Sequence, residues 1–406
     1  MKVLFTFGGM PHYVVAQLNK LQDSGVDVVA LIPEGKQATI GEGVRQEFEG
    51  IRFKLIFDKE IKTWYKKSFF QNFKKKIEEE NPDIVVFIWP YILSVVLLAG
   101  MYKYLRAKNN KIVLKEIPFD VPPFMKFVSY YKQNPLYNES MQKQSGGILF
   151  YLNALIVSFV RKCYYKRIDA SVNYTSAAYS IQTGYGLSPD RIFVTLNSTD
   201  ADLLASYCAE IQNEMSKLLP PSSKRIIHIG RLVKWKKVDV LIKAFAIVSE
   251  QIIDSELIII GSGPHLAELK KLTSNLGLDY RIKFIGAIND DKTLMRYLLE
   301  STVYVLAGMG GLSINDAMVA GKPVICSRCD GTEKFLVRDG FNGFFFQEDN
   351  VTDLADKINT LFRNPELVKK MGENSIQIIE KEVNMNVVSS KYLEAFQFVL
   401  HSTKNN

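Results

Sequence analysis

Residues 306–325 read LAGMGGLSINDAMVAGKPVI, and this stretch predicts the end of a strand, a tight turn, a helix and a second strand. Gly308, Gly310 and Gly311 allow the chain to turn sharply after the apolar residues before them. The apolar residues that follow have helical spacing, and Gly321-Lys-Pro323 ends the helix before the next buried strand. A glycine turn between a buried strand and a helix is typical of parallel α/β sheets, whose ligands bind at the carboxyl ends of the strands.

The same turn predicts a site for a phosphate or diphosphate. The backbone N–H groups of Gly310, Gly311 and Leu312 precede the helix, where unpaired donors and the helix dipole favour an anion. Asp316 lies one helical turn further on, beside Leu312, where its carboxylate can accept hydrogen bonds from sugar hydroxyls. Taken alone, a glycine turn also serves simply to let two backbones pack closely.

A second stretch, residues 228–245, reads HIGRLVKWKKVDVLIKAF. It predicts a strand that delivers Gly230, Arg231 and Lys236 to its carboxyl end, ahead of a helix from about Val238. A guanidinium and an ammonium at this point could neutralise a departing diphosphate. A basic run alone is more often a solvated loop, but its pairing with the glycine turn favours a functional interpretation.

The whole chain of 406 residues, 47% hydrophobic and 23% charged, alternates strand-like runs with helical patterns. This alternation predicts an α/β protein with two doubly wound, Rossmann-like domains facing across a cleft. We place the first domain at residues 1–198, the second at 199–378, and a C-terminal helix at 379–406 that packs back on the first. Strands are predicted at 3–7, 26–32, 53–57, 84–88, 112–116, 170–173, 192–195, 225–229, 256–260, 283–285, 303–306, 323–326 and 343–346.

The net charge of +8 lies entirely in the first half of the chain. Residues 1–200 contain 26 Lys and Arg against 18 Asp and Glu, whereas residues 201–406 contain 25 of each. Nucleic acid, an anionic membrane surface and a phosphorylated substrate are the candidate partners. No nucleic-acid recognition motif accompanies the excess, so we expect no nucleic-acid partner.

Two apolar stretches bear on membrane contact. Residues 84–102 are uncharged and long enough to span a bilayer, but Pro90 divides them, which favours a strand, a loop and a helix. Residues 148–160 are too few to span, and basic residues follow them, so they predict either a core helix or a helix at a membrane interface. Aromatic and basic residues cluster nearby at 64–70 and 124–132, while 119–147 has no clear period and predicts an irregular insertion.

The order and spacing of these motifs resemble the donor-binding domain of GT-B fold glycosyltransferases of the retaining family 4. Residues 230–236 match the family's Gly-Arg-Leu…Lys, and residues 261–264 match its Gly-x-Gly-Pro. Residues 284–286 match Phe-Leu-Gly, and residues 331–343 match Gly-x-x-Glu…Asp-Gly-x-Asn-Gly. The resemblance is in register from about residue 227 to residue 346 and looser elsewhere.

The resemblance implies a retaining glycosyltransferase that moves a hexose-like sugar from a nucleoside diphosphate to a glycan or lipid-linked acceptor in surface polysaccharide synthesis. Arg231 and Lys236 would stabilise the diphosphate, and Glu116, with Asp120 as the nearby alternative, is the candidate for acceptor-side chemistry. The remaining donor-binding residues would be Gly9, Gly230, Gly263, Ala287, Ile288, Gly308, Gly310, Gly311, Leu312 and Asp316. The expected location is cytoplasmic, with possible peripheral contact at the inner face of the membrane through the basic N-terminal half.

Three positions depart from the family pattern. Gly308 stands where the family has a glutamate that contacts the transferred sugar, Asp316 where it has the glutamate that contacts the ribose, and Lys237 where it has glycine. The absence of the glutamate side chain at Gly308 motivates one alternative, a non-catalytic sugar-nucleotide-binding partner protein. The other alternative is a nucleotide-sugar epimerase or phosphorylase of the same fold.

No cofactor and no metal are expected. Cys326 and Cys329 form a CxxC pair, but no second pair accompanies them, and the four histidines are scattered along the chain. Side chains and a helix terminus would neutralise the diphosphate without a metal ion. The nucleoside-diphosphate sugar is a co-substrate.

Overall fold

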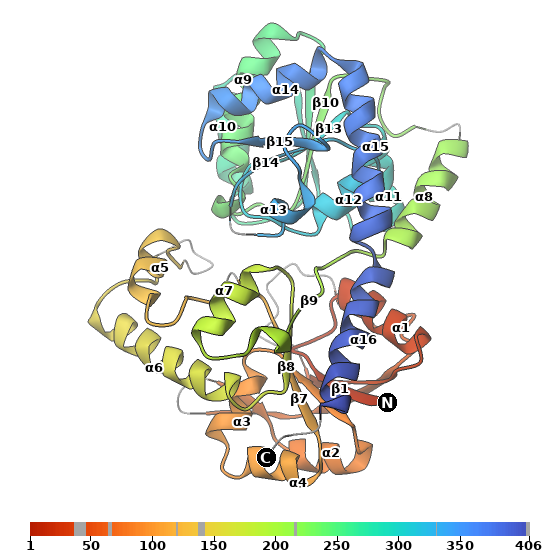
Figure 1. The fold of residues 1–406 in the computed structure, drawn as a ribbon. Coiled ribbons are helices and arrows are strands. Elements are labelled where there is room, and N and C mark those ends of the chain that lie inside the picture. Colours follow the sequence, from red (N-terminus) through yellow and green to blue (C-terminus); the bar gives the residue numbers. More distant parts are fainter. Residues whose placement is uncertain are drawn as a thin grey trace. The chain divides into compact units, whose positions relative to one another are not determined.

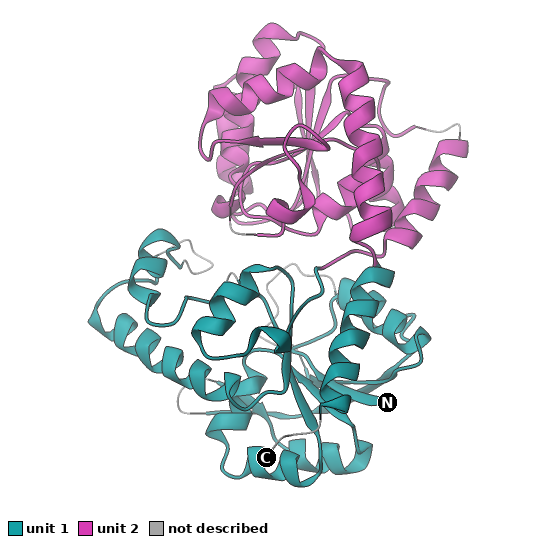
Figure 2. Cartoon of the chain, in the orientation of Figure 1, with its two compact units in different colours: residues 1–196, 385–406 teal, residues 197–384 magenta. Residues whose placement is uncertain are grey.

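Apolar runs of the chain form two parallel sheets in the computed structural model, with seven strands in one and six in the other among the residues that it describes (Figure 1). The sheets belong to two compact units: unit 1 comprises residues 1–196 and 385–406, and unit 2 comprises residues 197–384 (Figure 2). The structure describes residues 1–35, 46–63, 67–118, 121–136, 143–214, 217–329 and 331–402. Residues 64–66 of one aromatic and basic cluster, residues 119–120 and 137–142 of the predicted irregular insertion, and the alternative carboxylate Asp120 lie outside these ranges.

The sheet of unit 1 has the strand order β3-β2-β1-β6-β7-β8-β9, and every neighbouring pair is parallel. Its central strands are buried on both faces, which explains why they read as continuous apolar runs. The strands are β1 (Lys2–Thr6), β2 (Asp27–Pro33), β3 (Lys54–Asp58), β6 (Ile84–Phe87), β7 (Lys111–Glu116), β8 (Ala170–Asn173) and β9 (Ile192–Val194), with a separate antiparallel hairpin of β4 (Glu60–Lys62) and β5 (Ser68–Phe70).

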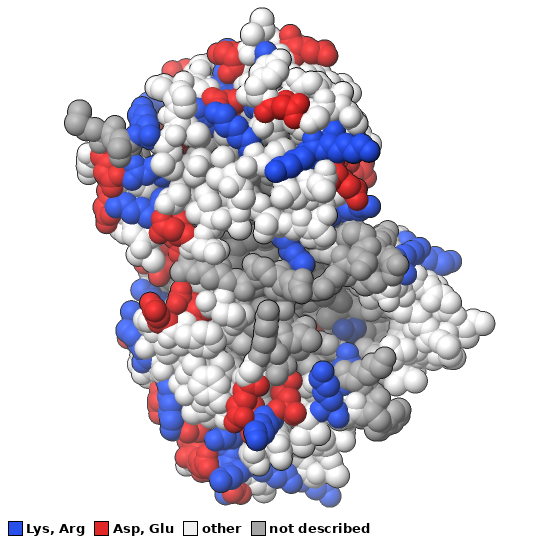
Figure 3. Space-filling view, turned by 180° about the vertical axis from the view of Figure 1, so that it is seen from behind, with Lys and Arg blue, Asp and Glu red and all other residues white. Residues whose placement is uncertain are grey.

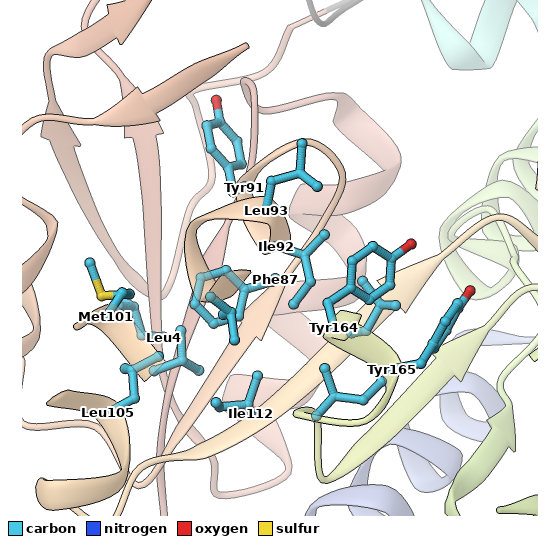
Figure 4. Packing of buried hydrophobic residues seen from close by; sticks show 14 of the residues in the cluster. Leu4, Phe87, Tyr91, Ile92, Leu93, Met101, Leu105, Ile112, Tyr164 and Tyr165 are labelled. Atoms are coloured by element: carbon cyan, nitrogen blue, oxygen red, sulfur yellow. The ribbon is translucent and has the colours of Figure 1, made fainter. Parts of the chain in front are cut away.

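Helices cover both faces of this sheet. The helices are α1 (His12–Asp23), α2 (Phe73–Glu80), η1 (Tyr91–Leu93), α3 (Ser94–Leu97), α4 (Met101–Ala107), α5 (Phe127–Gln133), α6 (Ile148–Tyr165), α7 (Ala177–Gly184), η3 (Pro189–Arg191) and α16 (Met385–His401). On one face, side chains of α1 and α16 form a core with alternate residues of the central strands. On the other face, Figure 4 shows Tyr164 and Tyr165 of α6 in the same cluster as Leu4, Phe87 and Ile112 from the strands.

The sheet of unit 2 has the order β12-β11-β10-β13-β14-β15, which is the 3-2-1-4-5-6 order of a Rossmann fold. The strands are β10 (Arg225–Ile229), β11 (Glu256–Ile260), β12 (Ile282–Gly286), β13 (Val303–Leu306), β14 (Val324–Ser327) and β15 (Gly343–Phe346). In this order the chain reverses direction across the sheet between β10 and β13. The carboxyl ends of these two strands therefore form the switch point at which ligands of such sheets bind.

The helices of unit 2 also form two layers (Figure 1). The elements are α8 (Ala201–Asn213), η4 (Lys234–Lys236), α9 (Val238–Gln251), α10 (Leu266–Asn275), α11 (Asp291–Leu299), α12 (Ser313–Val319), α13 (Glu333–Leu336), α14 (Val351–Phe362) and α15 (Pro365–Glu382). Helix α9 packs against α10 and α14 in one layer, and α12 packs against α8 and α15 in the other. The central strands β10, β11, β13 and β14 are thus almost completely buried, whereas the edge strands β12 and β15 are only partly buried.

Every strand predicted from the apolar runs is present within one or two residues of its expected limits, and both sheets are parallel as predicted. The uncharged stretch 84–102 forms buried β6 followed by short helices, which confirms the strand, loop and helix interpretation. The helix predicted after Pro90 is interrupted, because Gly100 takes a left-handed backbone with φ of +73° between α3 and α4. The hairpin of β4 and β5 was not predicted, since each strand has only three residues.

The last helix of the chain, α16, belongs to unit 1. Tyr392 and Phe396 contact the ring of Phe5 on β1, and the Tyr392 hydroxyl accepts a hydrogen bond from Lys115 Nζ at 2.8 Å. Helix α15 ends at Glu382 within unit 2, so unit 2 extends from Asn197 to Asn384 and α16 alone crosses back. The chain returns to unit 1 because the apolar face of α16 is buried there against β1.

We expect Phe396→Ala to lower the free energy of unfolding of unit 1 by about 3–4 kcal/mol, because it leaves a cavity beneath β1. Leu400→Ala is the matched control on α16, since that side chain is 37% exposed. Urea denaturation followed by tyrosine and tryptophan fluorescence measures both variants. Equal losses of unfolding free energy in the two variants would contradict the expectation that the buried side chain of Phe396 anchors α16 on the core.

Candidate functional site

The loops after β10 and β13 are joined at the switch point of unit 2 by one lysine. Lys236 Nζ donates to the carbonyl oxygens of Met309 at 2.8 Å and Gly310 at 2.7 Å. The Met309 N–H in turn donates to the Trp235 carbonyl at 3.0 Å. The two sequence stretches that predicted the site are therefore in direct contact, as parallel strands with neighbouring carboxyl ends require.

Gly308 has no room for a side chain. A Cβ atom built on Gly308 would lie 2.1 Å from the Trp235 carbonyl oxygen and 2.7 Å from the Lys236 carbonyl carbon. Both contacts are with backbone atoms, which cannot rotate away as a side chain can. With the two loops packed in this way, position 308 cannot hold the glutamate that the resemblance leads one to expect there.

Arg231 and three backbone N–H groups are available to a ligand at this edge of the sheet. The Arg231 side chain is half-buried and makes no hydrogen bond or ion pair with any residue that the structure describes. Within the same described residues, the N–H groups of Gly310, Gly311 and Leu312 have no acceptor. These four groups are all hydrogen-bond donors on the loops after β10 and β13, and together they suit an anion.

A buried carboxylate, Glu333 at the start of α13, lies behind the glycine turn. Its Oε1 accepts the Gly331 N–H at 2.9 Å, and a Cβ built on Gly310 would lie 2.5 Å from Oε2. Burial lowers the pKa of Lys236 to about 8, and the charge of Glu333 opposes that shift. Glu333 thus supports the charged form of Lys236. Glu333 belongs to the quoted Gly-x-x-Glu motif, so the sequence carried a signal for it, although it was not among the predicted site residues.

Asp316 lies on α12 beneath the glycine turn, where it is half-buried. Burial, with a smaller contribution from the charge of Asp291, raises the pKa of the Asp316 carboxyl to about 7. Its Oδ1 has no hydrogen-bond partner among the residues that the structure describes. A hydrogen bond from the Thr199 side chain opposes this rise of the pKa. The contact of Asp316 with the hydroxyls of a ligand stays a prediction.

Two buried polar side chains support the switch point from within the sheet. His228 Nδ1 on β10 lies 2.9 Å from the Val305 carbonyl oxygen on β13, and burial lowers the pKa of His228 to about 4, so the ring is neutral. Tyr304 on β13 places its hydroxyl 2.7 Å from Ser313 Oγ at the first turn of α12. Sequence reasoning assigned neither residue, because both look like ordinary strand positions.

The remaining glycines of the quoted motifs bring loops together. A Cβ built on Gly261 would lie 1.9 Å from the Gly230 carbonyl oxygen, and one on Gly263 would lie 2.3 Å from that of Leu232. The loops after β10 and β11 are hydrogen-bonded there, from the Leu232 N–H to the Ser262 carbonyl at 2.8 Å. This close packing explains why Gly261 and Gly263 lack side chains. The donor-binding role of Gly230 and Gly263 stays a prediction.

The predicted base-flanking residues follow strand β12, and Lys237, where the family pattern has glycine, follows the short helix η4. Ala287 is exposed and Ile288 half-buried in the loop after β12, and their contact with the base stays a prediction. Lys237 has φ of +52°, a left-handed backbone that explains the glycine of the family pattern. Its ammonium pairs with Glu348 at 2.6 Å and Asp349 at 2.8 Å, and these contacts direct its charge to acidic partners within unit 2.

Gly9 and Glu116, the predicted residues of the acceptor half, lie in unit 1. Gly9 follows β1 in a half-buried turn. Glu116 ends β7, where its carboxylate accepts hydrogen bonds from the Tyr164 and Tyr165 hydroxyls and from Gln182 Nε2. Burial raises the pKa of Glu116, and the nearby charge of Arg161 opposes that shift. These contacts give Glu116 a part in the packing of α6 and α7, and its role in acceptor chemistry stays a prediction.

Among the described residues, no group of three or more His, Cys, Asp or Glu side chains is arranged to hold a metal ion. Cys326 is buried in β14, and Cys329 contacts Ser327 Oγ through its thiol at 3.0 Å. The CxxC pair therefore sits in the packing of one strand and the loop that follows it.

We expect Gly308→Ala to destabilise unit 2 by roughly 2 kcal/mol or more, since the new methyl group forces the β10 and β13 loops apart. Gly184→Ala in unit 1 is the control, because a Cβ built there meets nothing within 4 Å. Thermal unfolding of both variants measures the difference. If Gly308→Glu proves as stable as the native protein, the steric explanation of this position is wrong.

The raised pKa of Asp316 predicts a pH dependence of stability. The folded protein holds this proton more tightly than the unfolded chain, whose ordinary value is 3.8, so stability falls as the pH rises toward about 7. Asp316→Asn removes this loss, and the variant should gain about 2 kcal/mol on the native protein between about pH 5 and about pH 8. Urea denaturation at both pH values tests this, with Asp356→Asn, at an exposed position of α14, as the control. The same pH dependence in the Asp316→Asn variant and the native protein would contradict the assignment.

Comparison with known proteins finds a family match within unit 2. Residues 210–378 match the family model described as glycosyl transferases group 1. Among curated relatives, the N-acetyl-alpha-D-glucosaminyl L-malate synthase of Bacillus anthracis is 26% identical over 228 residues, which are 55% of each chain. The poly(ribitol-phosphate) alpha-N-acetylglucosaminyltransferase of Staphylococcus aureus is 25% identical over 176 residues, 43% of this chain and 36% of that protein. The chain spans about half the length of the curated relatives it matches first.

Solved structures extend the likeness in fold to the whole chain. A glycosyltransferase from Rickettsia africae has a TM-score of 0.69 at 16% identity and covers 99% of both chains. Anabaena HepE in complex with UDP has a TM-score of 0.67 at 17% identity and covers 98% of this chain and all of its own. The chain therefore has the GT-B fold that its sequence predicts.

Proposed function

We propose that this protein is a retaining glycosyltransferase that moves a sugar from a nucleoside diphosphate to a glycan or lipid-linked acceptor in surface polysaccharide synthesis. The glycosyl transferases group 1 domain at residues 210–378 supports transfer of a sugar. The resemblance of the sequence motifs to the retaining family 4 supports the stereochemical outcome. The chemistry of the switch point supports a diphosphate as the leaving group.

One observation carries the proposal: at the switch point, Arg231 and three backbone N–H groups are without partners among the described residues, next to Lys236. Two positive charges and fixed N–H donors stabilise a leaving diphosphate as its negative charge develops. Lys236 is already oriented by the carbonyl oxygens of Met309 and Gly310, so binding does not need to order it. Arg231 has no competing acidic partner in the described chain.

The sugar and the nucleoside have candidate contacts nearby. Asp316, a half-buried carboxylate one helical turn after the glycine turn, is the candidate contact of the ribose hydroxyls, and Ala287 and Ile288 offer accessible apolar surface to the base. HepE of Anabaena, which shares the fold, was crystallised with UDP, which supports a nucleoside diphosphate as the ligand of this fold. The relative from Staphylococcus aureus, named for transfer to poly(ribitol-phosphate), supports a polymeric surface acceptor.

A second candidate function is that of a non-catalytic sugar-nucleotide-binding partner, and Gly308 favours it. No side chain fits at position 308, so the glutamate that the resemblance assigns to the transferred sugar is absent and no small adjustment restores it. A protein of this second kind would bind nucleotides at the same switch point without turnover.

Nucleotide binding is tested by thermal shift with UDP, GDP, ADP and CMP. A ligand that binds only the folded state adds ~2.7 kcal/mol of stability at a hundred times its dissociation constant, which is readily measured. We expect one diphosphate to stabilise the native protein, and Arg231→Ala to weaken that nucleotide about 10–100-fold through loss of charged hydrogen bonds. Arg363→Ala, on the far end of α14, is the matched control.

The outcomes separate the candidates. Slow hydrolysis of the matching nucleotide sugar, lost with Arg231→Ala, supports the transferase. Binding that needs Arg231, with no hydrolysis and no transfer to any tested glycan or lipid-linked acceptor, supports the non-catalytic partner. No binding of any nucleotide, with Arg231→Ala indistinguishable from the native protein, would sink both.

A further inference from the structure

Helix α6 (Ile148–Tyr165) of unit 1 exposes a continuous row of large apolar side chains. Leu149, Leu152, Ile156 and Phe159 recur at helical spacing on one face and are 82%, 51%, 62% and 50% exposed, and Ile148 at the helix start is 80% exposed. The only polar side chain among the exposed positions before Cys163 is that of Asn153. A row of this length far exceeds the scattered single apolar residues of an ordinary surface.

Neighbouring residues extend the apolar surface. Helix α5 packs against α6, and Met125, Val128 and Leu136 in and around α5 are 53%, 40% and 46% exposed. In Figure 3, the lobe at the right edge, where the N-terminal half of α6 lies, is largely white, with Lys and Arg side chains at its upper border. We call the exposed residues of α5 and α6, with Met125 and Leu136, the α5–α6 face.

Positive charge borders this apolar surface. Residues 121–168 contain seven Lys and Arg and a single acidic residue, Glu139, which lies outside the described ranges. Lys162 Nζ lies 4.4 Å from the ring centre of Phe124, whose ring contacts that of Phe159 in the exposed row. Lys166 is exposed seven residues after Phe159, and two helical turns bring it to the same face. Basic groups at the edge of an apolar row match an anionic lipid surface.

The C-terminal half of α6 is anchored in unit 1. Ser158, Arg161, Tyr164 and Tyr165 are buried, and both tyrosines hydrogen-bond to Glu116. By length and composition α6 is one helix that could cross a membrane. Crossing would remove these four side chains from the core, place the Arg161 guanidinium in hydrocarbon and leave Glu116 on β7 without its two tyrosine donors, at a high cost. A position along the membrane surface keeps the core intact and still buries the exposed row.

We propose that the α5–α6 face docks unit 1 on an anionic phospholipid bilayer, with the apolar row of α6 among the acyl chains and the neighbouring lysines at the headgroups. The surface goes beyond the proposed sugar transfer and does not depend on it. It gives the basic excess of the N-terminal half a defined place on the molecule.

Vesicle co-sedimentation without nucleotide or acceptor tests the proposal. The native protein should bind vesicles of phosphatidylglycerol and phosphatidylcholine, bind less as salt is added, and bind phosphatidylcholine alone weakly. The double variant Leu152→Glu with Ile156→Glu should bind about tenfold or more weakly, since charged side chains are costly among acyl chains. Ile253→Glu is the matched control, because Ile253 is an apolar residue of unit 2 that is 79% exposed.

Folding of the double variant is checked by its thermal unfolding, which should match that of the native protein because both positions are exposed. Equal vesicle binding by the double variant and the native protein would overturn the proposal. Binding of the native protein that is the same with and without anionic lipid would also overturn it. So would a dimer of the native protein that the double variant abolishes, since a second copy would then cover the α5–α6 face. Nucleotide binding in unit 2 is measured separately, so a failure here leaves the sugar-transfer proposal standing.

Discussion

The contact between the Lys236 ammonium and the carbonyl oxygens of Met309 and Gly310 determines how the site of unit 2 is built. It ties the loop after β10 to the loop after β13, across the point where the sheet changes direction. Because the two backbones lie so close, the positions where they touch must lack side chains, and Gly308 is the plainest case. The ammonium that joins the loops is also a charge that a diphosphate would meet.

The partners of each cation near these loops explain which charged groups remain free for a ligand. Lys237, in a left-handed backbone, directs its charge to Glu348 and Asp349, whereas Arg231 has no partner among the described residues. Glu333, buried behind the turn, favours the charged state of Lys236 although burial lowers its pKa. Lys237 and Arg231 follow the same strand, but acidic partners occupy the charge of Lys237, whereas that of Arg231 remains available to a ligand.

Unit 1 follows a different physical logic. Its sheet is covered by α16 on one face, while on the other face α6 is buried only along its C-terminal half. Glu116, Tyr164 and Tyr165 secure that half, and the apolar N-terminal half remains exposed beside lysines. A helix that is anchored at one end and apolar at the other presents a rigid surface for binding without strain on the core.

The sequence by itself determined the strands, the two Rossmann-like units and the residues of the switch point, because buried parallel strands and glycine turns leave strong local patterns. Arg231, Lys236 and residues 310–312 were identified from those patterns, and the structure places them in the loops after β10 and β13, with Lys236 hydrogen-bonded to Gly310. Only the tertiary structure decided that Gly308 excludes a side chain, that Glu333 supports Lys236, that Glu116 is enclosed by α6 and α7, and that α6 is exposed. Each of these depends on residues far apart in the chain, and local spacing carries no record of which distant atoms occupy the neighbouring space.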